Sequence, residues 1–288
     1  MSERPETERS STVKFDPESV AAYSAADVSL WSWTDEDEGT HVGYIADEHE
    51  KAAMGMAFVH FRSGVEFDFT WPYDEVCIVT RGSLTVDTLG RRITARAGQV
   101  MTQPKGVPGT FRIGEDLEMI CVHHPTFARA NGMSLQEYKA ATDAGEHPSL
   151  PVAAARRAQS AGGFFDPAVM QVFDISDIPD WITVDGEQGA KVGYIADKAE
   201  GAPFGLAFSD FRRGGVYELE FPYDEVAAIT SGSFTVRSNG RSFKASAGQM
   251  LYMPHGVSAV FEIDEDTVAV GLHHPTFEDA MGHPPHEG

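Results

Sequence analysis

Almost every recognisable stretch of this chain occurs twice. The stretches VGYIAD (42–47), PYDEV (72–76) and HHPTF (123–127) return 150 residues later, at 192–197, 222–226 and 273–277. Roughly half of the positions in 43–127 are identical to their counterparts in 193–277. A repeat of this length is a domain's worth of chain, so the sequence predicts a duplicated domain rather than a solenoid of short repeats.

The repeat also sets the expected boundaries. The two domains are expected at 15–127 and 165–277, between a flexible tail at 1–14 and a C-terminal tail at 278–288. The segment 128–164 is expected to be a helical linker. A short helix should begin after Ser134, and the alanine-rich stretch 151–163 can form another that ends at its glycine pair.

Within each unit the hydrophobic period is two, which is typical of β-strands. Turn residues separate short runs rich in β-branched and aromatic residues, at 55–62, 65–71, 75–80, 83–88, 91–97, 99–104, 109–113 and 117–124. Many short strands with few helices predict an all-β sandwich or barrel.

Composition limits the partners. The 288 residues carry a net charge of −22, which argues against binding nucleic acid and mildly favours cationic or neutral small molecules. Solvated acidic loops are the simpler explanation of that charge. We expect no membrane segment, because no apolar run approaches ~18 residues. The polar N-terminus is unlike a secretory signal, and the two cysteines form no disulfide framework, so we expect a cytoplasmic protein.

Two spacings in each unit carry a family resemblance. A glutamate is followed by six residues and a glycine, and then by a G-x5-P-x-G hairpin; these stand at Glu75–Gly82 and 98–106, and at Glu225–Gly232 and 248–256. This pattern resembles the cupin jelly roll. More closely, YDEVCIVTRGSLTV with AGQVMTQPKG resembles the cupin domain of the ethanolamine-utilisation EutQ family. The resemblance implies two tandem cupin barrels, a bicupin, joined by a partly helical linker. Paired barrels would form a pseudo-dimer within one chain, and further homo-oligomers stay open.

The chain departs from the metal-binding cupins. Those carry His-x-His shortly before the glutamate and a third histidine after the hairpin. In the first unit, the His-x-His positions hold either Asp68 and Thr70 or Phe69 and Trp71, and the third position holds Gly109. In the second unit, they hold either Glu218 and Glu220 or Leu219 and Phe221, and the third position holds Ala259. Without these imidazoles we expect no metal and no other cofactor. A divalent metal held by other ligands stays open as an alternative.

Strand alternation suggests an acid–base pair in each barrel. In 117–124 it places Met119, Cys121 and His123 on the inward face, and the same reasoning turns His273 inward. His123 and His273 would then lie near Glu75 and Glu225, as pairs able to act as general acid and base. The alternative is a buried structural hydrogen bond. His124 and His274 would cap the strand or meet the partner unit.

Other residues could help bind a substrate. Tyr73 and Tyr223 could donate protons or pack their rings, while Asp74 and Asp224 should bind loop backbone. Candidate substrate-binding residues are Glu218, Glu220, Tyr252, His255, Lys105 and Asp68. Glu218 and Glu220 could converge with Glu225 and bind a cation, or form an outward acidic strand. Cys77 and Cys121 are replaced together by Ala227 and Gly271, which suggests neighbouring free thiols in the first core.

These observations predict a small-molecule enzyme of amine or aldehyde catabolism, such as ethanolamine utilisation. The chemistry would be elimination or isomerisation, in the lyase or isomerase class, with Glu225 and His273 as the main pair on a small polar or cationic metabolite. The first barrel, with Glu75, His123 and Lys105, would be a second site or a structural copy. Two alternatives stay open: a Mn- or Fe-dependent cupin lyase or dioxygenase, and a non-catalytic binding or accessory protein.

Overall fold

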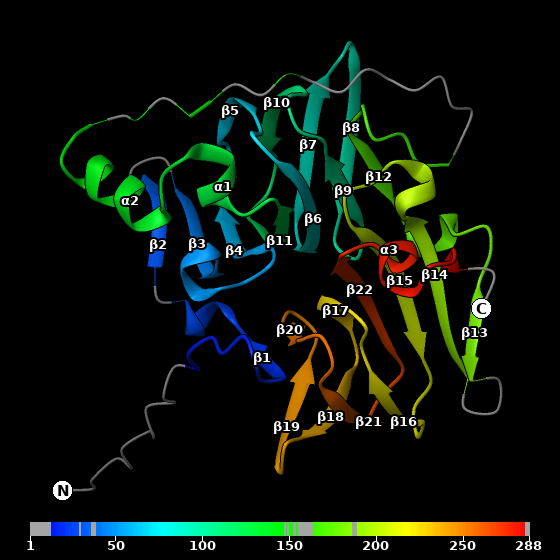
Figure 1. Ribbon diagram of the computed structural model, residues 1–288. Coiled ribbons are helices and arrows are strands. Elements are labelled where there is room, and N and C mark those ends of the chain that lie inside the picture. The colour runs from blue at the N-terminus through cyan, green and yellow to red at the C-terminus, as the bar shows by residue number, and fades with distance from the viewer. Residues whose placement is uncertain are drawn as a thin grey trace, which may run out of the picture.

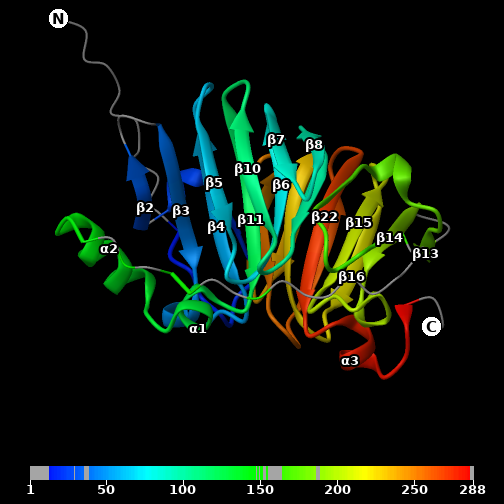
Figure 2. The same ribbon diagram turned by 90° about the horizontal axis from the view of Figure 1, so that it is seen from above.

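The chain folds into two tandem jelly-roll barrels that lie side by side (Figures 1 and 2). This computed structural model describes residues 13–285 except 29, 36–38, 147, 149, 152–153, 155–163 and 186–188. Over these residues, each barrel contains one seven-stranded and one four-stranded antiparallel sheet. The all-β prediction is therefore confirmed. Most of the expected N-terminal tail and of the expected helix at 151–163 lies outside the described residues.

The first barrel is built from two sheets. Its large sheet contains, in spatial order, β12 (Gln171–Phe173), β9 (Val100–Gln103), β6 (Asp74–Arg81), β11 (Leu117–His124), β4 (Gly55–Phe61), β3 (Thr40–Ala46) and β2 (Leu30–Asp35). Its small sheet contains β5 (Glu66–Thr70), β10 (Pro108–Ile113), β7 (Ser83–Thr88) and β8 (Arg91–Arg96). The eight strands expected from the period-two pattern correspond to β4 to β11.

The second barrel repeats this order. Its large sheet contains β1 (Ala21–Tyr23), β20 (Met250–Met253), β17 (Asp224–Ser231), β22 (Thr267–His274), β15 (Gly205–Phe211), β14 (Ala190–Ala196) and β13 (Ile182–Asp185). Its small sheet contains β16 (Val216–Glu220), β21 (Ser258–Ile263), β18 (Ser233–Ser238) and β19 (Arg241–Ser246).

Helices are short and lie outside the sheets (Figure 1). The described residues contain α1 (Phe127–Asn131), α2 (Leu135–Asp143), α3 (Phe277–Met281) and the 3-10 turns η1 (Ala25–Asp27), η2 (Glu48–Glu50), η3 (Ile175–Asp177) and η4 (Lys198–Glu200). The expected linker helix is confirmed as α2, which Ser134 caps by accepting a hydrogen bond from the Glu137 backbone N–H. None of the helices in the described ranges is long and apolar enough to cross a bilayer.

The two halves exchange an edge strand. The first-repeat strand β1 pairs with β20 of the second barrel, Ala22 lying opposite Leu251. The second-repeat strand β12 pairs with β9 of the first barrel, Val172 lying opposite Met101. Figure 1 shows β1 reaching across to β20. Each barrel is therefore completed by a strand from the other repeat.

Alternating side chains divide the interior into three cores. Met119 and Cys121 of β11 point into the core of the first barrel. Ile120 and Val122 point the other way, into a core shared by the two large sheets. The second barrel has its own core, which includes Ala269 of β22. The alternation predicted for 117–124 is therefore confirmed.

One pair of repeated histidines meets between the barrels. The rings of His124 and His274 stack with their centroids 3.9 Å apart. Their Nδ1 atoms lie 3.4 Å from the carbonyl oxygen of Ala53 and 3.2 Å from that of Pro203. Burial, and secondarily the neighbouring imidazole, lower the pKa of His124 to about 4. Of the two roles expected for this pair, meeting the partner unit is the one found.

Candidate functional site

The strand register places a glutamate opposite a histidine in each barrel. Glu75 of β6 lies directly across from His123 of β11, and Glu225 of β17 lies across from His273 of β22. Strand alternation turns all four side chains toward the barrel interior. The environments that they meet there differ between the two barrels.

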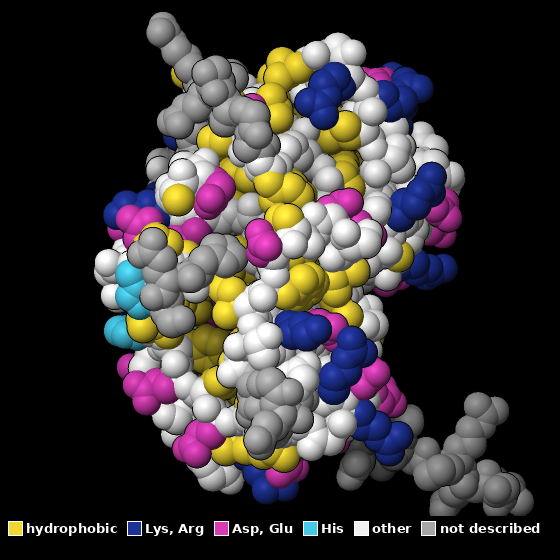
Figure 3. Space-filling view, turned by 90° about the vertical axis from the view of Figure 1, so that its right-hand side faces the viewer, with side chains coloured by type: hydrophobic (Ala, Val, Ile, Leu, Met, Phe, Trp, Pro, Cys, Tyr) yellow, Lys and Arg dark blue, Asp and Glu magenta, His cyan; other side chains and the backbone are white. Residues whose placement is uncertain are grey.

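The second barrel contains a cavity of about 410 Å³. Its wall is mostly hydrocarbon and aromatic, including Leu219, Phe221, Phe234, Leu251, Met253 and Phe261. The polar groups on the wall include Tyr194, Tyr223, Glu225 and His273. Figure 3 views the side where β13 and β14 lie and shows hydrophobic side chains exposed in hollows among charged ones. An apolar cavity with few converging polar groups is the usual form of a small-molecule site.

Glu225 is the carboxyl group deep in this cavity. Burial raises the pKa of Glu225 to about 8, because the charged form loses its hydration. Among the described residues no hydrogen bond to its carboxyl group is found. The carboxyl group lies against Gly271 of the neighbouring strand, where a Cβ would come within 2.6 Å of Glu225 Oε1. Near neutral pH this carboxyl group can hold or release a proton.

His273 is fixed by its surroundings rather than by Glu225. Its Nδ1 lies 3.0 Å from the carbonyl oxygen of Pro275, which can only accept, so Nδ1 carries the hydrogen. Its ring stacks on Tyr223 with centroids 3.9 Å apart. Nε2 is buried without a partner among the described residues. Burial lowers the pKa of His273, so the imidazole is neutral near pH 7.

The expected direct interaction between the glutamate and the histidine is thus not found. Glu225 and His273 share the cavity wall, but no hydrogen bond joins them in the described part of the chain. Nε2 of His273 is directed at Gly205, where a Cβ would lie 2.0 Å away. In the first barrel, Nε2 of His123 lies 4.0 Å from Asp47 Oδ2.

The tyrosines pack their rings on these histidines. Tyr73 stacks on His123, as Tyr223 does on His273, with centroids 3.9 Å apart in both cases. Tyr223 is also hydrogen-bonded to Tyr194. Burial, and secondarily Glu225, raise the pKa of Tyr223, so its phenol stays protonated. Its hydroxyl hydrogen is donated to Tyr194, so the two phenols form a hydrogen-bonded pair at the cavity wall.

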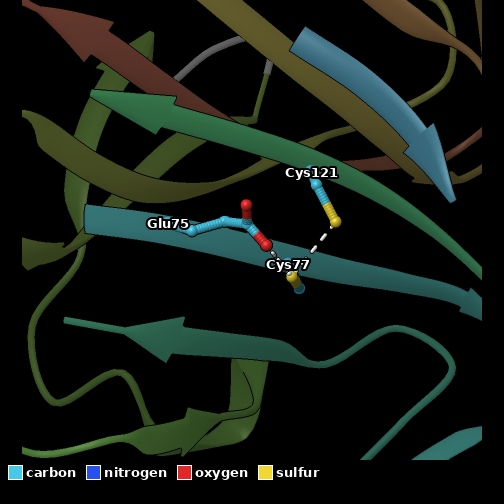
Figure 4. Close-up of side chains that lie close together, drawn as sticks. All are labelled: Glu75, Cys77 and Cys121. Carbon is cyan, nitrogen blue, oxygen red and sulfur yellow. Dashed lines mark hydrogen bonds between the residues drawn. The ribbon is translucent and has the colours of Figure 1, made fainter. Parts of the chain in front are cut away.

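The first barrel is nearly closed. Its cavity measures only about 30 Å³, and Phe67, Trp71 and Phe111 are among the side chains around it. Cys77 Sγ donates to Glu75 Oε1 at 3.1 Å and lies 3.1 Å from Cys121 Sγ (Figure 4). The neighbouring free thiols expected from the sequence are confirmed. Burial raises the pKa of Glu75 to about 8, although both thiols hydrogen-bond to it.

Several candidate substrate-binding residues lie away from either cavity. Along β16, Tyr217 is buried while Glu218 and Glu220 are exposed, so the acidic strand faces outward. Glu220 reaches only the rim of the second cavity and accepts a hydrogen bond from Ser258 Oγ. The convergence of Glu218 and Glu220 with Glu225 is therefore not found, because their side chains lie on the exposed face of β16 while Glu225 faces the cavity. Asp68 of β5 is likewise exposed and accepts from Thr110 Oγ1.

The hairpin residues also lie elsewhere. Tyr252 points into the core between the barrels and donates to Asp224 Oδ1 at 3.3 Å, because its neighbours Leu251 and Met253 take the inward positions. Lys105 and His255 lie at the hairpin tips. Their backbone N–H groups are bound by Asp74 and Asp224, which confirms the role expected for those carboxylates.

Sequence reasoning missed three kinds of residue. Tyr194 at the cavity wall and its counterpart Tyr44 come from the repeated VGYIAD stretch, which was a usable signal. The aspartate that ends this stretch is structural: Asp197 accepts from the Phe277 and Glu278 backbone N–H groups. Gln103, beside Cys77 in the first barrel, is replaced by Met253 in the second, and no pattern singled it out.

The donors of the second barrel do not fit the metal of typical cupins. A chelating site needs several ligand atoms within reach of one ion. The described residues offer Glu225 alone there, since Nε2 of His273 is directed away from it. In the first barrel, by contrast, Glu75, Cys77 and Cys121 place their ligand atoms within 4.8 Å of one another.

Comparison with solved structures supports the fold. Ylba from E. coli superposes with a TM-score of 0.60 at 12% identity, over 90% of this chain and 92% of that one. A mutant of Bacillus subtilis oxalate decarboxylase gives 0.54 at 17% identity, over 88% and 76%. A cupin 2 conserved barrel domain protein from Leptotrichia buccalis gives 0.55 at 9% identity, over 91% and 99%. These identities show the cupin fold alone.

Sequence comparison identifies the family. No curated protein matches the chain. The family model described as ethanolamine utilisation protein EutQ matches it twice, over residues 24–129 and 180–276. These segments correspond to the two repeats and together cover more than half of the chain. With both barrels matched in this way, the chain belongs to the EutQ family and is a bicupin.

Proposed function

We propose that the second barrel binds a small molecule and transfers a proton to or from it through Glu225. The observation that carries this proposal is a carboxyl group with a pKa of about 8 facing a cavity of about 410 Å³. A general acid or base works best when its pKa is near the working pH. Elimination and isomerisation are reactions that such a group can catalyse.

The cavity wall favours a particular class of ligand. Hydrocarbon lines most of it, so an uncharged molecule with one polar end fits better than a highly charged one. Protonated Glu225 can donate a hydrogen bond to a carbonyl or hydroxyl oxygen. A neutral amine could instead take the proton of Glu225 and form an ion pair. Small alcohols, aldehydes and amines, the compounds of ethanolamine-type catabolism, are therefore the proposed substrate class.

His273 would act as a positioning residue in this scheme. Its ring supports Tyr223 by stacking, and its Nδ1 hydrogen bond to Pro275 fixes the ring orientation. The first barrel would not repeat the reaction, since its cavity of about 30 Å³ has no room for such a substrate.

The test is to incubate the protein with a panel of small alcohols, aldehydes and amines in deuterated water. We expect deuterium incorporation or a new product, seen by NMR, for one class of compound. Glu225→Gln should abolish it, at least 100-fold, because the amide cannot exchange a proton in this way. The matched change Glu75→Gln, in the closed barrel, should leave it intact. Equal loss in both variants, or retained turnover in Glu225→Gln, would contradict the proposal.

One observation favours a second candidate, a non-catalytic binding protein. No side chain among the described residues is hydrogen-bonded to Glu225, and His273 Nε2 is directed elsewhere, so no hydrogen-bonded acid–base partner of Glu225 is found there. This candidate predicts that a member of the panel raises the melting temperature while no deuterium is incorporated. Glu225→Gln would then change the size of that shift only.

A further inference from the structure

The first barrel contains a cluster of sulfur and oxygen donors that the proposed function does not use. Cys77 and Cys121 lie directly opposite each other on β6 and β11, with their Sγ atoms 3.1 Å apart. Glu75 Oε1 lies 3.1 Å from Cys77 Sγ, and Gln103 Nε2 lies 2.9 Å from the same sulfur. Figure 4 shows the carboxyl group and the two sulfur atoms turned toward one another.

The cluster borders a small enclosed space with room for an ion. All four side chains line the cavity of about 30 Å³, and roughly 10 to 15 Å³ is enough for one water molecule. The side-chain oxygen of Gln103, which is 1% exposed, has no hydrogen-bond partner among the described residues. Since a buried polar atom without a partner is unfavourable, a ligand at this position would stabilise the carboxamide.

We propose that Cys77, Cys121 and Glu75 bind a zinc ion, with the Gln103 carboxamide oxygen as the fourth ligand. Two sulfur and two oxygen donors suit Zn²⁺, which prefers four ligands in a tetrahedron and accepts both thiolate and carboxylate. Cu⁺ prefers sulfur throughout, and Mg²⁺ or Ca²⁺ prefers oxygen throughout. A half-turn of the carboxamide presents its oxygen to the ion in place of its nitrogen.

The ion would replace the hydrogen bonds that join the cluster. Zinc–sulfur bonds of about 2.3 Å in a tetrahedron require the sulfur atoms to lie about 3.8 Å apart, so each must move by a few tenths of an ångström. Binding releases two thiol protons and the Glu75 proton to solvent, and the ion's two positive charges offset two of the three negative charges on the thiolates and the carboxylate. The affinity for Zn²⁺ should therefore rise with pH.

The second barrel supplies an internal comparison. It keeps the glutamate as Glu225 but has Ala227, Gly271 and Met253 where the first barrel has Cys77, Cys121 and Gln103. All three other donors are thus absent from the barrel that has the large cavity. The first barrel would be the metal-binding half and the second the small-molecule half.

Cobalt is the probe for the test, because tetrahedral Co²⁺ bound to thiolate has visible bands and a near-ultraviolet sulfur-to-metal charge-transfer band. The reduced full-length protein is titrated with Co²⁺, both folded and during refolding from denaturant, since the site is enclosed. We expect one Co²⁺ per chain and displacement by Zn²⁺. Cys77→Ala with Cys121→Gly, which places the second barrel's residues in the first, should lose the bands. Circular dichroism reports whether this variant is folded.

Two controls make the result decisive. Cys77→Ala alone should remove part of the charge-transfer intensity if the double variant does not fold. Glu225→Gln, in the other barrel, should bind Co²⁺ as the wild type does. No charge-transfer band under either titration, or a band that survives in both cysteine variants, would overturn the proposal.

Discussion

At the scale of single residues, the same glutamate has two different environments. Glu75 accepts a hydrogen bond from Cys77 in a closed core, whereas Glu225 faces an open cavity because Ala227 and Gly271 replace the cysteines. In both places burial raises the pKa to about 8. The stability of the protein should therefore depend on pH in a way that these two residues control.

The sign of this dependence follows from proton binding. In the unfolded chain a glutamate loses its proton near pH 4.5, but in the folded chain Glu225 keeps it until about pH 8. Between these values the folded state binds more protons, so the free energy of unfolding falls as pH rises, by on the order of a few kcal/mol.

Glu225→Gln should remove the contribution of this residue to that fall. Urea unfolding between pH 5 and about 9 measures it. In the metal-free protein Glu75→Gln should remove a similar share, and the double variant should have the flattest profile. A Glu225→Gln profile that parallels the wild type throughout would show that this carboxyl group is not buried as described.

At the scale of elements, strand packing fixes the imidazoles. β4 and β15 each begin with a glycine, Gly55 and Gly205, because the ring of the histidine opposite lies against the backbone there. A Cβ at either position would lie 2.0 Å from that ring. The prediction of β16 as part of the site shows the limit of pattern reasoning. Alternation predicts two faces, but only the packed barrel decides which face is inward.

Gly205→Ala should therefore destabilise the second barrel. His273 is held by Pro275 and Tyr223, so the clash cannot be relieved without moving β22, and we expect a loss of about 2 to 3 kcal/mol. Denaturant unfolding measures it. Gly114→Ala is the control, because no atom lies within 4 Å of a Cβ there. Equal stability of the two variants would contradict the close approach of His273 to β15.

At the scale of the whole molecule, the barrels depend on each other. They exchange β1 and β12, share a hydrophobic core between their large sheets, and meet at the stacked rings of His124 and His274. Neither repeat unit by itself contains all the strands of one barrel. The unit of folding is therefore expected to be the pair.

Splitting the chain within 155–163 tests this dependence. Each half alone would leave one edge of its large sheet unpaired and the face toward the other barrel exposed, so we expect aggregation. The two halves produced together should associate one to one, as seen by light scattering after size exclusion. A stable folded monomer of either half would contradict the expectation.

The sequence by itself determined the duplication, the family, the β-strands of each repeat and the inward or outward direction of residues such as Cys121 and Ile120. These features depend on local periodicity or on comparison of one stretch with another. Only the tertiary structure decided that β1 and β12 cross between barrels, that Glu218 faces outward, and that one barrel is closed while the other is hollow. Strand exchange and cavity volume depend on side chains brought together from distant strands, and no local pattern in the chain records their combined packing.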